Sequence, residues 1–318
     1  MSATAAQERT FRVTLVLEYV PYVGLVALFI AATIASSSFL TVHNLLDVAQ
    51  TSAVLGFVTL GSSIVLLSGN LDLSVGAIMG AGAMACFAVE SAGAPIATLV
   101  GLAVGAGLGA ANGFLVALLG ANSLIVTLGV ASIVSGGLLV LSNAVFLTGN
   151  DASLRVVGQN TVVGIPVSVV LFVVVLVMLT VWTRRHASGR AIAAVGANPR
   201  ASFASGLAVP RLRFYCFVAS GLLAALAGIV LAARVNSAYS SMGATYTFEA
   251  ITAAVLGGVS LFGGSGSVVR ATVGVLILAL LTNMMNLIGA PIESQLIAEG
   301  VLFISFVALD GFARRQPS

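Results

Sequence analysis

Long apolar stretches, separated by short polar breaks, follow one another along almost the whole chain. A helix needs about 20 mostly apolar residues to cross a bilayer, and most of the stretches approach that length. The pattern predicts an all-α polytopic membrane protein with about ten transmembrane helices, not a β-barrel. The predicted spans are 20–38, 47–68, 73–91, 95–119, 123–146, 164–183, 213–233, 248–262, 268–288 and 294–310.

Two of these spans leave an alternative open. The 248–262 stretch is short, so a half-helix is the alternative to a full crossing. The 20–38 stretch ends in small residues that suit cleavage, but it exceeds the usual apolar region of a signal peptide, about 7–15 residues. We therefore expect it to remain as the first transmembrane helix.

Glycines recur every fourth residue along the fourth predicted span, at Gly101, Gly105, Gly109 and Gly113. This spacing places them on one face of a helix, where a second backbone can approach closely. We interpret the stripe as tight helix packing and assign it no role in permeation.

Arginines mark three points of the chain and predict its orientation. Six lie in the 184–213 stretch, while Arg9 and Arg12 precede the first span and Arg314 and Arg315 follow the last. Cationic segments stay on the cytoplasmic side during membrane insertion. The predicted organisation is a cytoplasmic N-terminus at 1–19, helices at 20–183, a cytoplasmic loop at 184–212, helices at 213–310 and a cytoplasmic C-terminus at 311–318.

Composition excludes an ordinary soluble protein. Hydrophobic residues make up 59% of the chain and charged residues 7%, with a mean hydropathy of +1.14, whereas soluble proteins average about 25% charged residues. The formal charge of +3 reflects the arginines of the expected inner face, and we expect no nucleic-acid partner. Cys86 and Cys216 stand singly in apolar stretches, so we expect free, buried thiols.

The chain lacks the residue patterns that nucleotide hydrolysis, zinc binding and nucleophilic catalysis require. The chain has no lysine, so it cannot carry the phosphate-binding loop of an ATPase, whose lysine reaches the terminal phosphates. With only His43 and His186 a zinc site is not expected, and no serine lies in a nucleophile motif. We expect a protein that is not an enzyme and that binds no cofactor or metal.

Two Gly-rich breaks interrupt apolar helices and resemble each other: SGNLDLSVGA (Ser68–Ala77) and GGVSLFGGSGSVV (Gly257–Val269). Paired interruptions in the two halves of a transporter can mark an internal repeat, with broken or re-entrant segments that line a cavity. The alternative is a pair of tight turns, in which Asp72 caps the next helix. The two roles are compatible at Asp72.

Three segments carry a family resemblance: SGNLDLSVG, GRAIAAVGANPRASFASGL (Gly189–Leu207) and ARVNSAYSSMGATYTFEAITAAVLGGVSLFGGSGS (Ala233–Ser267). They resemble the ribose/monosaccharide branch of ABC importer permeases, and the resemblance runs from about Asn44 to Asp310. It implies a bacterial inner-membrane permease that forms the path for a monosaccharide or a related small polar solute. It also implies a second permease copy, a cytoplasmic ATP-binding subunit that holds ATP and magnesium, and an extracytoplasmic sugar-binding protein.

The resemblance gives the 184–212 loop a role as the ATPase-coupling loop. Ala191–Val195 is expected to form a short helix that breaks at Gly196, and Asn198 and Pro199 to start another, as cap and first turn. Such a short projecting helix can transmit closure of an ATPase as a rigid-body movement. The expected coupling residues are Gly189, Arg190, Gly196, Asn198, Pro199, Arg200 and Gly206.

For Arg184 and Arg185 we favour retention at the inner face and contact with anionic lipid. The Pro199-Arg200 pair departs from the family, in which an acidic or polar residue usually follows the asparagine. Ser135 and Arg270 also depart from it, because relatives often carry arginine and glycine there.

Polar side chains in or beside the spans are the candidates for the path, since amides and hydroxyls suit a sugar. Each has the alternative role of a helix–helix hydrogen bond, worth on average about 0.6 kcal/mol. Asn283 and Asn286 share a helical face, which we expect to line the path instead of a neighbouring helix. The full set is Gln50, Thr59, Asn70, Asp72, Ser74, Thr127, Glu249, Gly263, Gly264, Gly266, Asn283 and Asn286.

Glu299 lies inside the tenth predicted span, where an acid is usually functional or paired. It keeps open a proton-coupled secondary transporter, although the sequence suggests no second acid or histidine deep in a span for a relay. The branched-chain amino-acid permeases are a further alternative, because they share the fold of the sugar branch. AVGANP in the loop resembles the sugar branch more closely.

Overall fold

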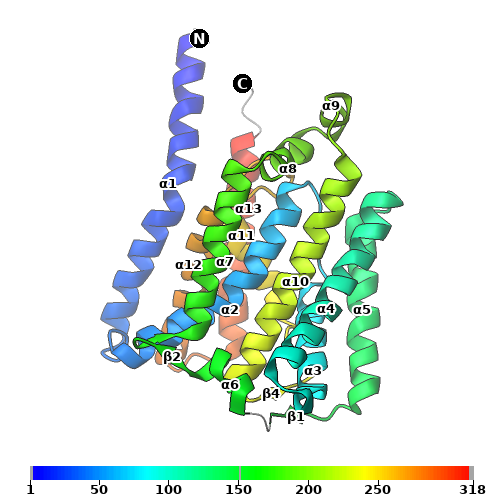
Figure 1. Cartoon of the computed structure of the whole chain (residues 1–318). Helices are drawn as coiled ribbons and strands as arrows, with labels where there is room; N and C mark the ends of the chain where they lie inside the picture. Colours follow the sequence, from blue (N-terminus) through cyan, green and yellow to red (C-terminus); the bar gives the residue numbers. More distant parts are fainter. Residues whose placement is uncertain (1–2, 150–151, 315–318) are drawn as a thin grey trace.

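The computed structural model describes residues 3–149 and 152–314, and these form a bundle of helices (Figure 1). The long bundle helices and their short companions are α1 (Ala3–Ala35), α2 (Val42–Leu67), α3 (Val75–Ala88), α4 (Ala94–Gly113) with its π-helical end η2 (Phe114–Leu118), α5 (Ser123–Ser142), α7 (Val167–Arg185), α10 (Val209–Val235), α11 (Tyr246–Leu256), α12 (Val268–Leu287) and α13 (Ile292–Arg314). Outside the predicted spans lie α6 (Ala152–Gln159), α8 (Ala187–Ala197) and α9 (Pro199–Ala204), while η1 (Glu90–Ala92) overlaps the end of the predicted 73–91 span.

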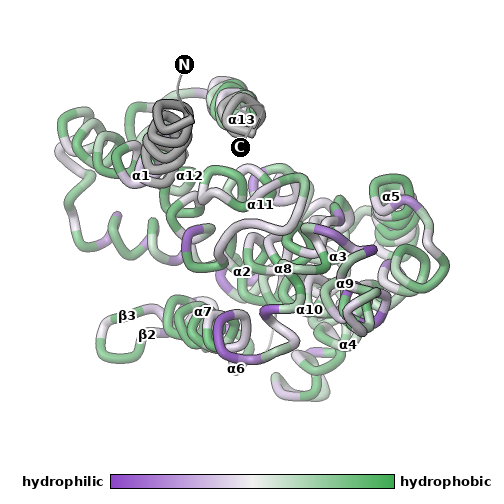
Figure 2. Tube along the Cα trace, turned by 90° about the horizontal axis from the view of Figure 1, so that it is seen from above, coloured by the Kyte–Doolittle hydropathy of each residue, from purple (hydrophilic) through white to green (hydrophobic). Residues whose placement is uncertain are grey.

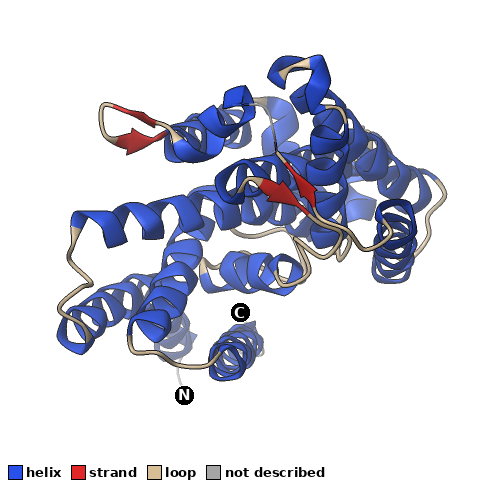
Figure 3. Cartoon of the chain, turned by 90° about the horizontal axis from the view of Figure 1, so that it is seen from below, coloured by secondary structure: helices blue, strands red, loops and turns tan. Residues whose placement is uncertain are grey.

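Two short strand pairs lie at the end of the bundle opposite α8 and α9 (Figures 1 and 3). β1 (Leu147–Thr148) pairs antiparallel with β4 (Ser237–Ala238), and β2 (Thr161–Val162) pairs antiparallel with β3 (Ile165–Pro166). The apolar pattern did not predict these pairs or α6. They connect the helices at that end of the molecule.

The all-α membrane class is confirmed. In the part of the chain that the structure describes, six helices are long and apolar enough to cross a bilayer: α2, α4 with η2, α5, α7, α10 and α12. Each predicted span overlaps one bundle helix, while the number of full crossings stays a prediction. Residues 1–2 and 315–318, which belong to the predicted cytoplasmic termini, lie outside the described residues.

The prediction of a full third span over 73–91 is wrong. The helix there, α3, has only 14 residues, because Gly69–Ser74, between the end of α2 and the start of α3, is irregular chain. The half-helix alternative holds for the eighth span, since α11 has 11 residues. Both helices fall short of the ~20 residues of a full crossing.

The two half-helices belong to an inverted arrangement. Antiparallel α2 and α10 lie side by side at the centre (Figure 1), and each is followed by an irregular segment and then a half-helix. The half-helices begin at a shared point, where a Cβ on Gly76 would collide with the Gly243 carbonyl oxygen, and a Cβ on Gly243 with that of Gly76. Thr247 Oγ1 also accepts a hydrogen bond from Gly76 N at 3.1 Å. We call this contact of Gly76 with Gly243 the glycine crossing.

The first break also meets a segment that the sequence did not pair with it. Ser68–Ala77 contacts the segment before α11 as well as Gly257–Val269, its predicted partner. The two matching segments read SVGA (Ser74–Ala77) and SMGA (Ser241–Ala244). Four residues carry too little signal to be noticed without the contact between their glycines.

The glycine stripe of α4 packs as predicted. A Cβ on Gly105 would collide with Ala225 and the Gly221 carbonyl of α10, and one on Gly109 with the Phe217 carbonyl. Gly101 makes the same kind of close contact with the backbone of α3. Small residues thus bring three helices together through their backbones.

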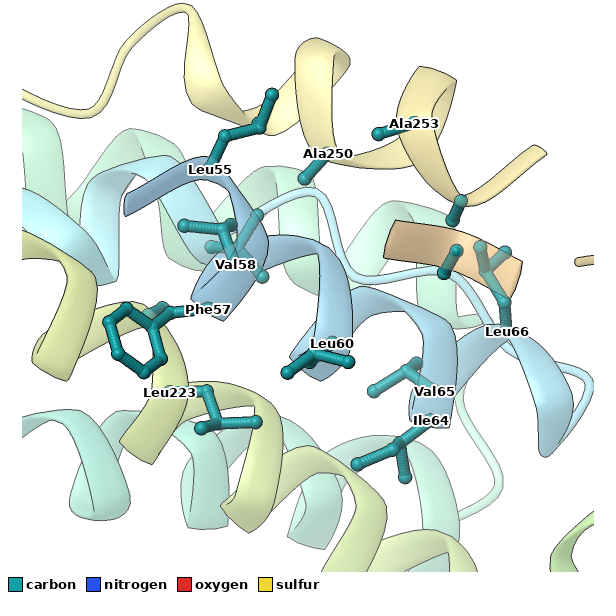
Figure 4. Packing of buried hydrophobic residues seen from close by; sticks show 14 of the residues in the cluster. Leu55, Phe57, Val58, Leu60, Ile64, Val65, Leu66, Leu223, Ala250 and Ala253 are labelled. Carbon is teal, nitrogen blue, oxygen red and sulfur yellow. The ribbon is translucent and has the colours of Figure 1, made fainter. Parts of the chain in front are cut away.

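The hydrophobic core is centred on α2, nearly all of which is buried. Figure 4 shows side chains of α2, among them Phe57, Leu60 and Ile64, packed between Leu223 of α10 and small residues of α11. By contrast, α5 and α7 stand at the edge of the bundle (Figure 2), and few of their residues are buried. Their apolar surfaces are suited to lipid or to a further membrane subunit.

We predict that Gly105→Leu destabilises the protein, because the new side chain has to push α4 away from α10. Overpacking of this kind costs typically about 1–3 kcal/mol. The matched control is Gly107→Leu on the same helix, since a Cβ at Gly107 meets open space. Thermal unfolding of the detergent-purified variants should show a lower midpoint for Gly105→Leu alone. Equal midpoints would contradict the assigned packing.

Candidate functional site

Three segments that are far apart in the sequence meet at the end of the bundle that carries α8. Gly264 N donates a hydrogen bond to Leu67 O at 3.2 Å, which joins the α11–α12 turn to the end of α2. Gly196 of α8 lies against both, because a Cβ there would collide with Leu67 O and Gly264 N. Gly263 packs in turn on the backbone of Gly69. We call this contact, formed by 67–69, 196–197 and 263–264, the glycine junction.

The junction explains why glycine occupies these positions. Gly69, Gly263 and Gly264 have φ angles of +78°, +84° and +76°, which other residues adopt only with strain. Arg213 of α10 adds a fourth element, since its Nε donates to Ser68 O at 3.2 Å. The two predicted breaks and the 184–212 loop, the predicted coupling loop, are therefore in direct contact. Gly266, with a φ of +139°, follows in the same turn.

The coupling loop forms two short helices, as predicted, but their boundaries differ. Helix α8 runs from Ala187 to Ala197, so the predicted break at Gly196 is wrong. Gly196 provides the close approach to α2 described above and does not end the helix. The predicted start of α9 agrees with the geometry: Asn198 Oδ1 accepts from Ala201 N at 3.0 Å, and Pro199 lies in the first turn. Gly206 follows the end of α9 with a φ of +83°.

Two of the expected coupling residues hold the loop to the preceding helix. A Cβ on Gly189 would collide with the Trp182 carbonyl of α7. Arg190 Nη1 donates to Arg185 O at 2.7 Å and to Arg184 O at 3.4 Å, so it caps the C-terminus of α7. Their contacts therefore give both residues a structural role.

The exposed surface of the loop lies on α9. Arg200 is exposed, and Phe203, three residues later on the same face, is 70% exposed. An aromatic side chain beside a cation, on a short protruding helix, is typical of a protein contact. Phe203 was not among the sequence candidates.

Asp72 is buried and holds the first break in place. Its Oδ1 accepts from Ser74 N at 3.0 Å and Ser74 Oγ at 2.6 Å, and its Oδ2 accepts from Ser220 Oγ of α10 at 3.0 Å. Asn112 Nδ2 of α4 donates to Ser74 Oγ at 2.7 Å. Ser74 is the residue before the first turn of α3, and Asp72 bonds this residue and not the first N–H groups of the helix, so the predicted capping of α3 by Asp72 is wrong.

Two more candidates support the same irregular segment. Thr127 Oγ1 of α5 accepts from Leu73 N at 3.0 Å, and Asn70 Nδ2 donates to Ser68 Oγ at 3.1 Å. Thr127 thus satisfies a backbone N–H that has no helical partner inside the bundle, while Asn70 bonds a side chain of the same break. Their contacts lie within the protein and account for their polarity.

The pair of asparagines on α12 bonds neighbouring elements, contrary to the expectation. Asn283 and Asn44 of α2 exchange two hydrogen bonds, of 2.7 and 3.1 Å. Asn286 Oδ1 accepts from Gln295 Nε2 of α13 at 2.7 Å. These are helix–helix hydrogen bonds, the alternative role recognised for them. A role of either amide in the path stays a prediction.

The remaining candidates divide between packing and an acidic pair. Thr59 is fully buried and donates to Leu55 O of its own helix at 2.8 Å, whereas Gln50 is half-buried. Glu299 accepts from Thr282 Oγ1 of α12 at 3.3 Å and lies close enough to Glu249 of α11 to repel it. Because α11 packs against α13, the fold brings Glu249, at the start of the eighth span, toward Glu299 of the tenth.

A cavity of about 220 Å³ opens beside the glycine crossing. It lies between the start of α3, the middle of α5 and the segment before α11. Three hydroxyl-bearing residues line it along with small and apolar ones: Gly76, Ala77, Ser135, Leu139, Ser240, Ser241 and Ala244. Small polar groups of this kind can hydrogen-bond a neutral polyhydroxylated molecule without holding it tightly. None of these residues was in the candidate set.

At the opposite end from α8 the polar groups form a separate network. Arg234 donates to Thr51 Oγ1 at 3.0 Å and to Asp47 Oδ1 at 3.3 Å. His43 Nε2 lies 3.3 Å from Asp47 Oδ2. Arg155 of α6 donates to Asn236 Oδ1 at 3.0 Å. This end therefore presents an ordered polar surface.

Comparison with known proteins shows that the sequence belongs to a family. The family model described as "Branched-chain amino acid transport system / permease component" matches residues 44–307. The ribose import permease protein RbsC of Bacillus subtilis (strain 168) is 35% identical over 91% of each chain. The D-allose transport system permease protein AlsC of Escherichia coli (strain K12) is 35% identical over 90% of this chain and 88% of its own.

A third relative is the autoinducer 2 import system permease protein LsrC of Enterobacter sp. (strain 638), which is 32% identical over 92% of this chain and 86% of its own. No solved structure matches the chain.

Proposed function

Since the chain belongs to the family of permease components of branched-chain amino acid-type transport systems, we propose that it is the membrane subunit of an ATP-driven importer for a monosaccharide or a closely related small polar solute. The observation that carries this proposal is similarity along nearly the whole length to permeases named for ribose, D-allose and autoinducer 2. The family description names amino acids, but these relatives support the sugar branch. The chain is a transport subunit and not an enzyme.

The proposed partners follow from the same family. An ATP-binding subunit would hold ATP and magnesium, since this chain has no lysine for a phosphate-binding loop. A solute-binding protein would deliver the sugar to the ordered polar end around Arg155 and Arg234. A second permease copy would complete the path, and the exposed apolar helix α5 offers surface for it.

We further propose that the end carrying α8 and α9 faces the cytoplasm. The arginine-rich loop lies there, and the described ends of α1 and α13 lie at the same end (Figure 1). The proposed cytoplasmic segments are 1–19, 184–212 and 311–318. This orientation obeys the rule that cationic loops remain inside.

Cysteine labelling tests the orientation. A cysteine at Val163, which is 97% exposed between β2 and β3, should react with a membrane-impermeant maleimide added to intact spheroplasts. A cysteine at Ser188 on α8 should react only after permeabilisation. The native Cys86 and Cys216 are both buried, so they give a low background. Labelling of Ser188→Cys in intact cells would overturn the orientation.

The glycine junction suggests how ATP hydrolysis reaches the path. A push on α9 and α8 acts directly on the end of α2 and on the α11–α12 turn, because Gly196 is packed against both. One route continues through Gly69–Ser74 into α3, and the other runs back along α11. Both half-helices start at the glycine crossing, beside the cavity. A rigid-body movement of α8 would therefore reach the cavity from two sides.

Reconstitution tests the function. The complex with its ATP-binding subunit and binding protein should take up labelled ribose into proteoliposomes only with ATP, and excess leucine should not compete. Arg200→Glu reverses the charge on exposed α9 without touching the junction. We predict at least a tenfold loss of ribose uptake and of sugar-stimulated ATP hydrolysis, equivalent to about 1.4 kcal/mol of coupling.

Arg200→Lys is the control for that variant and should stay near the original rate, because it keeps the cation. Competition by leucine in place of other monosaccharides would favour the amino-acid alternative. Normal coupling in Arg200→Glu would remove α9 from the proposed ATPase contact.

We propose that the solute passes through the cavity beside the glycine crossing. We predict that Ser135→Phe, which fills the cavity, lowers ribose uptake at least tenfold while capture by the binding protein is unchanged. Ser132→Phe is the matched control, since Ser132 is exposed one turn earlier on α5 and does not line the cavity. If both variants transport equally, the path lies elsewhere.

A further inference from the structure

A second cavity, of about 320 Å³, lies beside α8, between the end of α7 and the start of α12. Arg184 and Arg190 line it, together with Thr183 of α7 and Ser267 and Val268 at the start of α12. None of the described residues that line it is acidic. The cavity therefore brings together two arginines, of which Arg190 also bonds the C-terminus of α7, and a helix N-terminus.

Each of these features attracts a negative charge. The first N–H groups of a helix have no intrahelical acceptor, and its N-terminus carries a partial positive charge. The side chain of Ser267 does not cap α12, and its first turn has no acid, as far as the structure describes it. Arginine binds phosphate oxygens through paired N–H donors. The chemistry fits a phosphate group with oxygens on more than one side.

The position of the cavity indicates where that phosphate comes from. Helix α7 is apolar and few of its residues are buried, and Val173, Val177 and Val181 are exposed. The cavity lies at the end of this lipid-facing surface, on the same level as the arginine-rich loop. In the proposed orientation this is the height of the inner-leaflet headgroups.

We propose that the cavity binds the headgroup of an anionic phospholipid, and that the bound lipid strengthens coupling between the ATPase and the path. Gly189 and Ala193 of α8 form one wall of the cavity, and Leu67 of the glycine junction another. A headgroup in this space contacts α7, α8 and α12 together, so it holds α8 in position for the junction. The effect on coupling rests on the proposed function, while binding of the lipid does not.

The test uses the assembled complex in nanodiscs of phosphatidylcholine, with or without phosphatidylglycerol. Native mass spectrometry measures how much phosphatidylglycerol remains bound, and sugar-stimulated ATP hydrolysis measures coupling. Arg184→Gln should weaken retention about fivefold, the effect expected for one basic residue at an anionic surface. Arg185→Gln removes the same charge from the adjacent position, which does not line the cavity, and should change retention less than twofold.

Ser267→Asp is an independent variant. An aspartate at this position caps α12 well, so the fold should survive, but its carboxylate repels a phosphate from the cavity. It should abolish the stimulation by phosphatidylglycerol and leave the basal rate in phosphatidylcholine unchanged. Equal lipid retention in wild type, Arg184→Gln and Ser267→Asp would overturn the proposal.

Inorganic phosphate separates the two sources of the same chemistry. Added to complexes in phosphatidylcholine alone, it should not reproduce the stimulation. If it does, and Arg184→Gln removes the effect, the ligand is a free anion and the lipid assignment is wrong. Retention of lipid is measured without turnover, so a protein that fails to transport sugar still gives a decisive result on the site.

Discussion

Close approach of backbone to backbone at glycine is the constraint on which the rest of this structure depends. A membrane protein has to satisfy its backbone polar groups internally, so irregular chain is tolerated only where it is enclosed by protein. The glycine crossing and the glycine junction enclose the two breaks in this way. Asp72, Thr127 and Thr247 then supply hydrogen bonds to the irregular chain that a continuous helix would have made for itself.

The same contacts make the breaks mechanically connected. At the glycine junction, α8 touches the backbone of both breaks, and from there α11 and Gly69–Ser74 lead to the glycine crossing. Contacts between backbone atoms allow little relative movement, because no flexible side chain lies between the two segments. A small displacement of α8 is therefore passed on and not absorbed. The fold thus links α8 and α9 to the cavity beside the glycine crossing.

The sequence predicted what depends on local signals. The apolar stretches, the glycine stripe of α4 and the Asn198–Pro199 helix start are all encoded within a few neighbouring residues. What it missed depends on contacts between distant residues: α3 begins where Gly76 meets Gly243, and Asn283 bonds Asn44, 239 residues away. Ser135, Ser240 and Ser241 were missed because serines are common, and only the fold gathers these three around one cavity.

The arginines show how one residue type is divided between structure and contact. Arg190 and Arg213 donate hydrogen bonds to backbone carbonyls of α7 and of the first break, so they fix the shape of the loop. Arg200 and Arg184 lie exposed, one on the protruding α9 and one at the rim of a cavity. A guanidinium that is already bonded to the backbone contributes less to a partner than one that is free to rearrange. Positive charge alone predicts that all four arginines lie on one side of the membrane. Only their individual contacts distinguish the arginines that shape the loop from those that are able to bind a partner.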